Sequence, residues 1–259
     1  MKNKRRVILS FDVDGERAFR SIDKSDKDIY LDQGVPAITR FLKENDLDAT
    51  FFTVGKNIQD FPETHELLKD YEIGNHTFSH PRFLTKKGQK EKETEIKKSH
   101  DIITEFFGNP PVMFRAPDYS IDRDIFDILK SMNYKGDSSM IKVLLPFRYF
   151  SNYLKQWKLA GDELEIPLTS FIIPFNGTSV ISFGMNYAKI VFNILIMFRK
   201  TIVLNFHPRD FVNIGIEETG FMNRAKALET SLAFLKYINE KCDVMSFRQY
   251  MSGEKNLQN

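Results

Sequence analysis

Short apolar segments alternate with longer segments of helical periodicity along most of this chain. Residues 6–11 (RVILSF), 49–54 (ATFFTV) and 201–206 (TIVLNF) are apolar runs of the length that buried strands have. Residues 34–45 and 86–107 carry apolar side chains at helical spacing. Because strands that alternate with helices form a parallel sheet that the helices cover, the pattern predicts an α/β fold built on a parallel sheet or barrel.

Further segments extend this alternation to the end of the chain. Extended segments are expected at 112–117, 134–139, 164–169 and 243–247, and helices at 123–132 and 222–239. The stretch from Met140 to Lys200 is the exception, since one strand with its helix needs about half that length. We therefore expect an insertion at about 140–200 that shapes or covers one end of the sheet, within a single domain of residues 1–259.

The charges and the single cysteine exclude several classes of protein. The chain holds 37 Lys and Arg against 35 Asp and Glu, without the basic stripe that binds nucleic acid. Cys242 is the only cysteine, which excludes an intramolecular disulfide framework and a thiolate zinc site. The first apolar run is too short for an export signal, so a cytoplasmic protein is expected. The longest apolar patch, 187–198, is shorter than a membrane span of roughly 20 residues, but it could rest against a lipid surface.

An acidic pair follows the first predicted strand. Asp12 and Asp14 are one residue apart, and alternation along a strand sends both side chains to the same side. Two carboxylates placed together repel each other unless a cation or a shared proton relieves them. The competing interpretation is a simple turn, because acidic residues before a glycine such as Gly15 often form one.

Three of the five histidines occur in segments where chemistry is expected. His76 and His80 are four positions apart, a spacing that places both imidazoles on one side of a helical turn, as a divalent metal requires. His207 follows the strand at 201–206, where it could protonate a leaving amine or serve in packing. His100 is expected to be half buried and hydrogen bonded, and His65 to lie on a helix surface.

Five segments in this order resemble the motifs of the polysaccharide deacetylase family, the NodB-homology domain of carbohydrate esterase family 4. They are SFDVDG, HTFSH, FRAPDYS, GDSS and LNFHP, which together cover most of the chain. Five longer segments that contain or follow these motifs look most like the branch associated with exopolysaccharide and surface-glycan biosynthesis. They are EIGNHTFSH, FRAPDYSI, YKGDSS, IPLTSFIIPFNG and FHPRDF. The resemblance implies a distorted (β/α) barrel of seven strands.

The resemblance also implies a metal centre. Asp14, His76 and His80 match the family's metal ligands. The implied cofactor is a divalent ion, with Zn²⁺ first and Co²⁺ or another divalent ion as alternatives. Such an ion polarises an acyl carbonyl and lowers the pKa of water toward roughly 7.

The same resemblance implies roles in proton transfer. Asp12 would be the general base, Arg115 would hold it ionised and aimed, and His207 would be the general acid. Asp137 is the residue expected to orient His207, with a structural turn as the alternative. A backbone N–H near Asp118 would stabilise the oxyanion.

Two departures from the family pattern concern the substrate. Val13 separates two aspartates that most members have side by side, a variant found in branches that include lipid-linked-sugar deformylases. In the arginine motif, Pro117 is followed by Asp118 where many deacetylases have an aromatic residue, and Tyr119 comes next. These three residues are the candidate substrate-binding group. For Asp118 we favour a cap on the following helix over a contact with a cationic or hydroxyl-rich substrate.

The implied function is metal-dependent hydrolysis of N-acetyl groups on amino sugars of a polysaccharide or glycan precursor. The alternatives are a deformylase of a lipid-linked amino sugar, an allantoinase-like amide hydrolase, and, in another class, a non-catalytic glycan-binding protein. The expected partner is an N-acetylated glycan or a lipid-linked sugar, and no nucleic acid. Aromatic and cationic residues alternate in 146–159, around Trp157, and an apolar run follows at 186–200. We favour core packing as the explanation of this composition. The alternative is peripheral contact with the inner face of a membrane, with a groove for a lipid-linked glycan.

Overall fold

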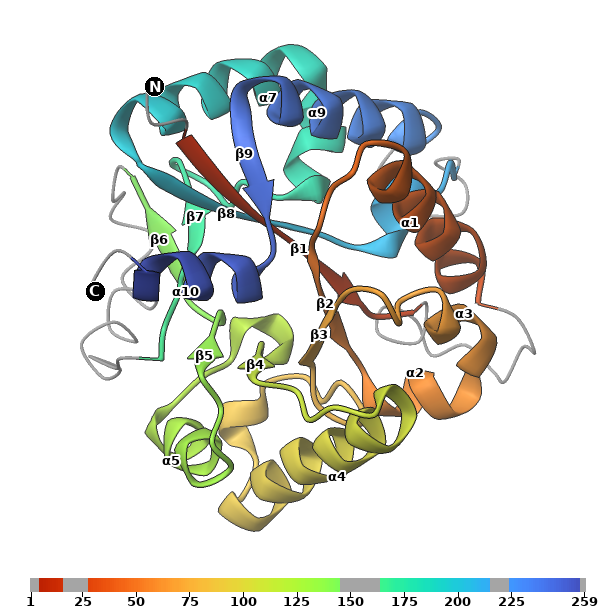
Figure 1. The fold of residues 1–259 in the computed structure, drawn as a ribbon, viewed down its shortest axis with the longest axis vertical. Coiled ribbons are helices and arrows are strands. Elements are labelled where there is room, and N and C mark those ends of the chain that lie inside the picture. The colour runs from red at the N-terminus through yellow and green to blue at the C-terminus, as the bar shows by residue number, and fades with distance from the viewer. Residues whose placement is uncertain (1–4, 16–27, 145–163, 215–223, 257–259) are drawn as a thin grey trace.

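The computed structural model describes residues 5–15, 28–144, 164–214 and 224–256. Its centre is a seven-stranded sheet in the order β5-β4-β3-β2-β1-β8, with β9 also paired to β1 (Figure 1). All these pairings are parallel. The strands are β1 Arg5–Val13, β2 Thr50–Thr53, β3 Glu72–Asn75, β4 Met113–Phe114, β5 Gly136–Asp137, β8 Thr201–Phe206 and β9 Cys242–Met245.

A second, two-stranded sheet lies between the ends of the first. It consists of β6 (Ile141–Val143) and β7 (Leu168–Ser170), which pair in parallel. The N–H of Val203 in β8 donates to Thr169 Oγ1 at 3.0 Å, and the N–H of Ile166 donates to the carbonyl of Asp137 in β5 at 2.7 Å. The expected insertion therefore closes the side of the sheet between β5 and β8. The result is the distorted barrel that the sequence predicted.

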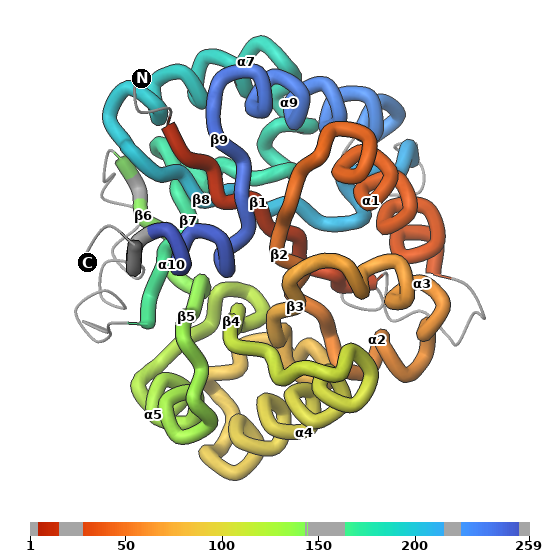
Figure 2. Tube along the Cα trace, in the orientation of Figure 1, coloured from red at the N-terminus to blue at the C-terminus, as the bar shows by residue number. Residues whose placement is uncertain are grey.

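Helices surround this barrel. Those at one edge of the molecule, α7 and α9, lie side by side, and α4 and α5 lie together at the opposite edge (Figure 2). The helices are α1 Val35–Glu44, α2 Gly55–Asp60, α3 Pro62–Glu66, α4 Gln89–Phe107, α5 Arg123–Ser131, α7 Gly177–Phe198, α9 Ala227–Lys241 and α10 Phe247–Asn256. Short 3₁₀ segments span Leu84–Lys86, Pro117–Tyr119 and Pro208–Phe211, and a π-helical turn spans Tyr30–Gly34.

Strand β1 separates the core from the interior of the barrel. Its odd-numbered residues from Val7 to Val13 pack in the main hydrophobic cluster with α1, α7 and α9. Fully burying one such side chain, Phe11 for example, contributes roughly 1.5–3 kcal/mol. Successive side chains of a strand point to opposite faces, so Ser10 and Asp12 are turned into the barrel. Hydrophobic burial on one side of β1 thus determines which polar groups meet on the other.

Two elements near the histidine motif differ from the predictions. No strand was expected at 72–75, because Glu72, Gly74 and Asn75 are poor strand formers. The structure forms β3 there because both neighbouring strands pair with it. β2 pairs along its whole length, with Thr50 Oγ1 donating to Glu72 Oε2 at 2.6 Å, and β4 pairs at Asn75 and Phe114. The long helix begins at Gln89 rather than 86, after the 3₁₀ turn Leu84–Lys86.

His65 is buried rather than on a helix surface. Its side chain is 0% exposed, and Nδ1–H donates to the carbonyl of Phe61 at 2.9 Å. Burial, opposed in part by this hydrogen bond, lowers the pKa of His65 to about 4. In an unfolded chain the pKa of histidine is about 6.5. Between these values the unfolded state binds more protons, so stability must fall as the pH falls from about 6.5 toward 4.

The expected consequence is measurable in urea unfolding. His65 alone should make the metal-free protein about 2 kcal/mol less stable at pH 5 than at pH 7. His65→Gln should lose about that much of the pH dependence, because glutamine keeps a donor for the Phe61 carbonyl but does not titrate. An unchanged difference between the two pH values in the variant would contradict this assignment.

Candidate active site

The candidate side chains converge at the carboxyl ends of the parallel strands. Asp12 and Asp14 come from the end of β1, His76 follows β3, Arg115 follows β4, and His207 follows β8. All five are buried. Because neighbouring parallel strands end at the same edge of the barrel, residues from distant parts of the sequence meet there.

His76 and His80 meet on a loop, not on a turn of helix as predicted. Thr77 and His80 adopt left-handed backbone conformations, with φ of 66° and 54°. The chain bends sharply enough between them to bring the two imidazole rings to 5.0 Å between centroids, in a T-shaped arrangement. Left-handed non-glycine residues are strained and concentrate at functional sites.

Glu95 on α4 holds this histidine loop in place. Its Oε2 accepts the N–H groups of Phe78 at 3.1 Å and Ser79 at 2.8 Å, and Oε1 accepts the Ser79 hydroxyl at 2.7 Å. One carboxylate therefore satisfies the backbone between the two histidines. Glu95 positions the loop without facing the site itself.

Asp14, His76 and His80 form a group that fits a divalent cation. One ligand atom from each lies within 4.8 Å of the others. The Nδ1–H of His76 donates to the carbonyl of Arg115 at 2.7 Å, which leaves the lone pair on Nε2 to face a metal. Asp14 Oδ1 is buried and has no hydrogen-bond partner. Two imidazoles and a carboxylate are a common donor set for zinc and similar ions.

The electrostatics of this group also favour a cation. Burial lowers the pKa of His76 and lowers that of His80 to about 4, so both imidazoles are neutral, the form that binds metals. Burial also raises the pKa of Asp14, although His207 and His80 partly oppose the shift. A divalent cation between these side chains would favour the ionised form of Asp14.

Arg115 is the hydrogen-bonding centre of the barrel interior and is 0% exposed. Its Nη1 donates to Asp12 Oδ1 at 2.7 Å and to Asn205 Oδ1 at 2.9 Å, and its Nε donates to the carbonyl of Ser138 at 2.8 Å. The guanidinium also lies 4.1 Å from the ring centroid of Phe52. Such a rigid planar donor fixes the orientation of the carboxylate it binds.

Asp12 is consequently held ionised although it is buried. Burial alone would raise its pKa, but the charges of Arg115, His76 and His207 and the Arg115 hydrogen bond together lower it to about 2. Asn205 Nδ2 donates to the second oxygen, Asp12 Oδ2, at 2.8 Å. Asp12 is therefore a carboxylate, able to accept a proton, throughout the neutral range.

His207 lies between the acidic pair and a third carboxylate. Its Nε2 is 3.8 Å from Asp12 Oδ2 and 3.9 Å from Asp14 Oδ2. Its Nδ1 is 3.5 Å from Asp210 Oδ2, and its backbone N–H donates to the same oxygen at 2.9 Å. Arg224 Nη2 donates to Asp210 Oδ1. Burial opposes ionisation of Asp210, yet His207, Arg224 and Arg209 lower its pKa to about 2.

The prediction that Asp137 orients His207 is therefore wrong. Asp137 accepts the N–H and the hydroxyl of Ser139, at 3.0 and 2.7 Å, and its carboxyl group faces that of Glu165. Burial raises the pKa of Asp137. The carboxylate beside His207 is Asp210, three residues further along the same loop. Asp137 serves the turn after β5, which was the alternative interpretation.

Asp118 does not cap the following helix as expected. Asp122 caps α5 instead, accepting the N–H of Ile125 at 3.1 Å. Asp118 lies exposed at the rim and is left-handed at φ 52°, with its carboxylate 4.0 Å from Arg82 Nε. Pro117 is buried inside the turn.

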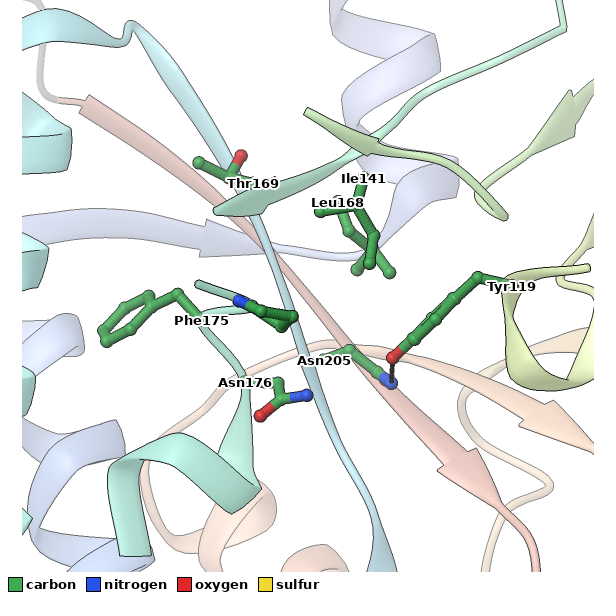
Figure 3. Close-up of a pocket in the computed structure, with 8 residues that line it drawn as sticks. Tyr119, Ile141, Leu168, Thr169, Phe175, Asn176 and Asn205 are labelled. Carbon is green, nitrogen blue, oxygen red and sulfur yellow. Dashed lines mark hydrogen bonds between the residues drawn. The ribbon is translucent and has the colours of Figure 1, made fainter. Parts of the chain in front are cut away.

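Tyr119 faces the reaction centre from the side of a small pocket. Figure 3 shows its phenol pointing at the amide of Asn205, which donates to the hydroxyl at 3.4 Å. The pocket is mainly apolar, and its lining residues are Tyr119, Ile141, Leu168, Thr169, Pro174, Phe175, Asn176 and Asn205. Of the three candidate substrate-binding residues, the structure brings Tyr119 to this pocket.

Sequence reasoning missed several residues that support the site. Asn205 could have been found, because alternation along β8 puts it on the same side as His207, two positions later. The spacing of Asp210, three residues after His207, was a further signal. Glu95 and Arg224 have no local signal, since each reaches its partner only through the fold.

Comparison with known protein sequences points to one family. The family model described as polysaccharide deacetylase matches residues 1–136. A peptidoglycan-N-acetylglucosamine deacetylase of Bacillus cereus is 32% identical over 117 residues, covering 44% of this chain and 37% of that protein. The match thus spans well under half of that relative.

Solved structures share the fold at low sequence identity. A Mycobacterium smegmatis protein described as a polysaccharide deacetylase superposes with a TM-score of 0.71 at 17% identity, covering 99% of this chain and 92% of that one. A pseudoenzyme of the CE4 family from Bacillus anthracis has a TM-score of 0.57 at 13% identity, covering 96% and 66%. Because both occur among the neighbours, the fold alone does not distinguish an enzyme from an inactive relative.

Proposed function

The chain belongs to the polysaccharide deacetylase family, and from this premise we propose that it removes N-acetyl groups from amino sugars of a polysaccharide or glycan precursor. The observation that carries the proposal is the buried group in which Asp12, ionised by Arg115, lies beside Asp14 and His207. A protein that only binds glycans has no need of a base, an acid and a set of metal ligands in contact.

Asp14, His76 and His80 would hold the metal, for which we propose Zn²⁺. A divalent ion at this position supplies Lewis-acid polarisation of the acyl carbonyl and lowers the pKa of water toward roughly 7. The Arg115 carbonyl orients His76 for this task through the Nδ1–H hydrogen bond.

The side chains around these ligands would perform the proton transfers. Asp12 accepts the proton of the attacking water, and its pKa of about 2 keeps it in the required form. Arg115 and Asn205 hold its two oxygens in fixed directions. His207 donates a proton to the departing sugar nitrogen, which would otherwise be a poor leaving group. The backbone N–H of Asp118 would stabilise the negative charge on the acyl oxygen, since Pro117 has no N–H and that of Tyr119 donates to the carbonyl of Ala116.

The small pocket beside Asn205 supports a short acyl group. Ile141 and Leu168 present apolar surface on one side, and the Tyr119 hydroxyl marks its boundary toward Asp12 (Figure 3). An acetyl methyl group suits such a small apolar pocket, whereas a long acyl chain would not fit between its walls.

Asp210 should act through His207, as a positioning residue. Asp210→Asn should lower kcat on the order of 10- to 100-fold, because the imidazole of His207 loses the carboxylate that orients it. KM and the metal content should stay near wild-type values, since the changed side chain lies behind His207 and belongs neither to the metal ligands nor to the pocket lining. Steady-state kinetics with metal analysis separate this outcome from general damage, which would change all three quantities.

The test of the proposed function is product identity. The zinc-loaded protein is incubated with N-acetylated chitooligosaccharides and with peptidoglycan fragments, and acetate and free amine are quantified. Asp12→Asn is the control, because it keeps the three metal ligands and lacks the base. Acetate released by the wild type alone supports the proposal. Formate released from a formylated amino sugar would identify a deformylase instead, and a ring-opened ureide would identify an allantoinase-like enzyme. Binding of the glycan without turnover would identify a glycan-binding protein.

A further inference from the structure

Helix α7 is buried on one side only. Val191, Phe192 and Leu195 belong to the main core cluster, and the ring of Phe192 meets that of Phe234 in α9 at 5.8 Å between centroids. In length and mean hydropathy the helix could cross a membrane, but its inner side is an integral part of the barrel's covering layer. It therefore lies along the body of the protein.

The outer side of α7 is apolar and exposed. Ile190, Met197 and Phe198 are 62%, 70% and 67% exposed, and Phe183, just before the kink at Gly184, is 57% exposed. Residues seven apart, such as Ile190 and Met197, lie on the same face of a helix. We call Ile190, Met197 and Phe198, which follow the kink, the α7 face. The predicted aromatic segment around Trp157 lies outside the described residues.

Cations border the α7 face along one side and at its C-terminal end. The sequence has no acidic residue between Glu165 and Asp210. Lys189 Nζ lies 5.1 Å, and Lys241 Nζ 4.9 Å, from the ring centroid of Tyr237, beside the helix. Lys200 is exposed just beyond the end of α7.

The start of β1 adjoins the same end of the helix. The Arg6 N–H donates to the carbonyl of Lys200 at 3.0 Å, while its guanidinium lies 5.0 Å from the ring centroid of Tyr250 in α10. The apolar stripe is thus bordered by Lys189 and Lys241 along its side and by Lys200 at its C-terminal end.

We propose that the α7 face docks on the surface of a membrane that contains anionic lipids. An exposed apolar stripe with basic borders has the composition of helices that lie in the interface between headgroups and acyl chains. A second copy of the chain is a poorer occupant, because pairing two such faces would bring the same cations together.

Helix α7 also connects the docking face to the pocket beside Asn205. Asn176 lines that pocket and caps the helix, accepting the N–H of Ser179 at 3.1 Å. The pocket and the α7 face therefore lie on one element, on opposite sides of its kink at Gly184. Lipid contact itself does not depend on the proposed hydrolase activity.

The test is co-sedimentation with vesicles of phosphatidylcholine alone or mixed with phosphatidylglycerol. The wild type should bind the mixed vesicles, and a variant with Ile190→Gln, Met197→Gln and Phe198→Gln should bind more than tenfold more weakly. Leu67→Gln is the matched control, since Leu67 is a large apolar residue that is 46% exposed away from α7. It should bind like the wild type. Thermal unfolding and turnover of a soluble substrate should be the same in all three proteins.

The lysines that border the α7 face provide an independent test of lipid binding. Lys189→Gln and Lys200→Gln should each weaken binding to the anionic vesicles about fivefold and reduce its dependence on salt. Absence of binding by the wild type, or equal binding by the triple variant, would overturn the proposal. A stable dimer in sedimentation velocity that the triple variant abolishes, without lipid binding, would replace the membrane with a second copy of the chain.

Discussion

Replacing His80 with alanine should remove the bound divalent ion and lower the rate of acetate release by at least about 10³-fold. His80 supplies one of the three protein ligands in the candidate group, from a loop with a left-handed backbone. Alanine has no side-chain atom that could bind the metal in its place. Losing one strong ligand from such a set leaves a site that competes poorly with water for the ion. The decisive measurement is metal stoichiometry by mass spectrometry after zinc loading and dialysis.

The control for this experiment is another histidine of the same chain. His100→Gln changes a half-buried imidazole whose Nδ1 is hydrogen bonded to the Tyr134 hydroxyl at 3.0 Å, away from the site. It should keep about one ion per chain, as the wild type should. If His80→Ala also keeps its ion, or if the wild type binds none, the assignment of Asp14, His76 and His80 as metal ligands is wrong. The acid and base roles must then be reassigned.

Arg115→Met should abolish activity and destabilise the protein by about 3–5 kcal/mol. Methionine fills much of the same volume but leaves the carboxylate of Asp12 buried without its cation and its main donor. In the wild type Arg115 outweighs the effect of burial and the pKa of Asp12 is about 2. In the variant the charge of Arg115 is absent, so burial raises this pKa. The proposed base would be protonated where the enzyme must work.

The pH dependence distinguishes this cause from a simple packing defect. In the wild type, the low pKa of Asp12 contributes stability above pH 4 that is lost as the pH falls toward 2. In Arg115→Met the sign reverses, because a raised pKa gives stability at low pH that is lost as the pH rises. The difference in unfolding free energy between the two proteins should therefore grow from pH 4 to pH 7 in urea unfolding.

A double variant completes the experiment. Asp12→Asn combined with Arg115→Met removes the unpaired buried charge, so it should recover a large part of the lost stability while remaining inactive. A double variant as unstable as Arg115→Met at pH 7 would show that the arginine acts through its contacts with Asn205 and Ser138 instead.

Local patterns were sufficient where chemistry depends on neighbours in the chain. Alternation along β1 correctly predicted that Asp12 and Asp14 share one side, because a strand repeats every two residues whatever surrounds it. The alternation of strands and helices likewise predicted a parallel sheet or barrel, and the family resemblance implied the barrel. The remaining candidate residues lie at or after the ends of β3, β4, β5 and β8.

The tertiary structure decided the features that depend on distant partners. Helical spacing was the wrong explanation for His76 and His80, since Glu95 from α4 holds the loop in a conformation that local preferences disfavour. The partner of His207 proved to be Asp210, held by Arg224 from further along the chain, and not Asp137. The sequence by itself thus determined which chemical groups this protein carries and that Asp12, Asp14 and His207 lie at strand ends. The tertiary structure decided which of these groups are in contact. Hydrogen bonds and charges act between groups that are close in space, and the number of residues between two groups does not give their distance in the folded chain.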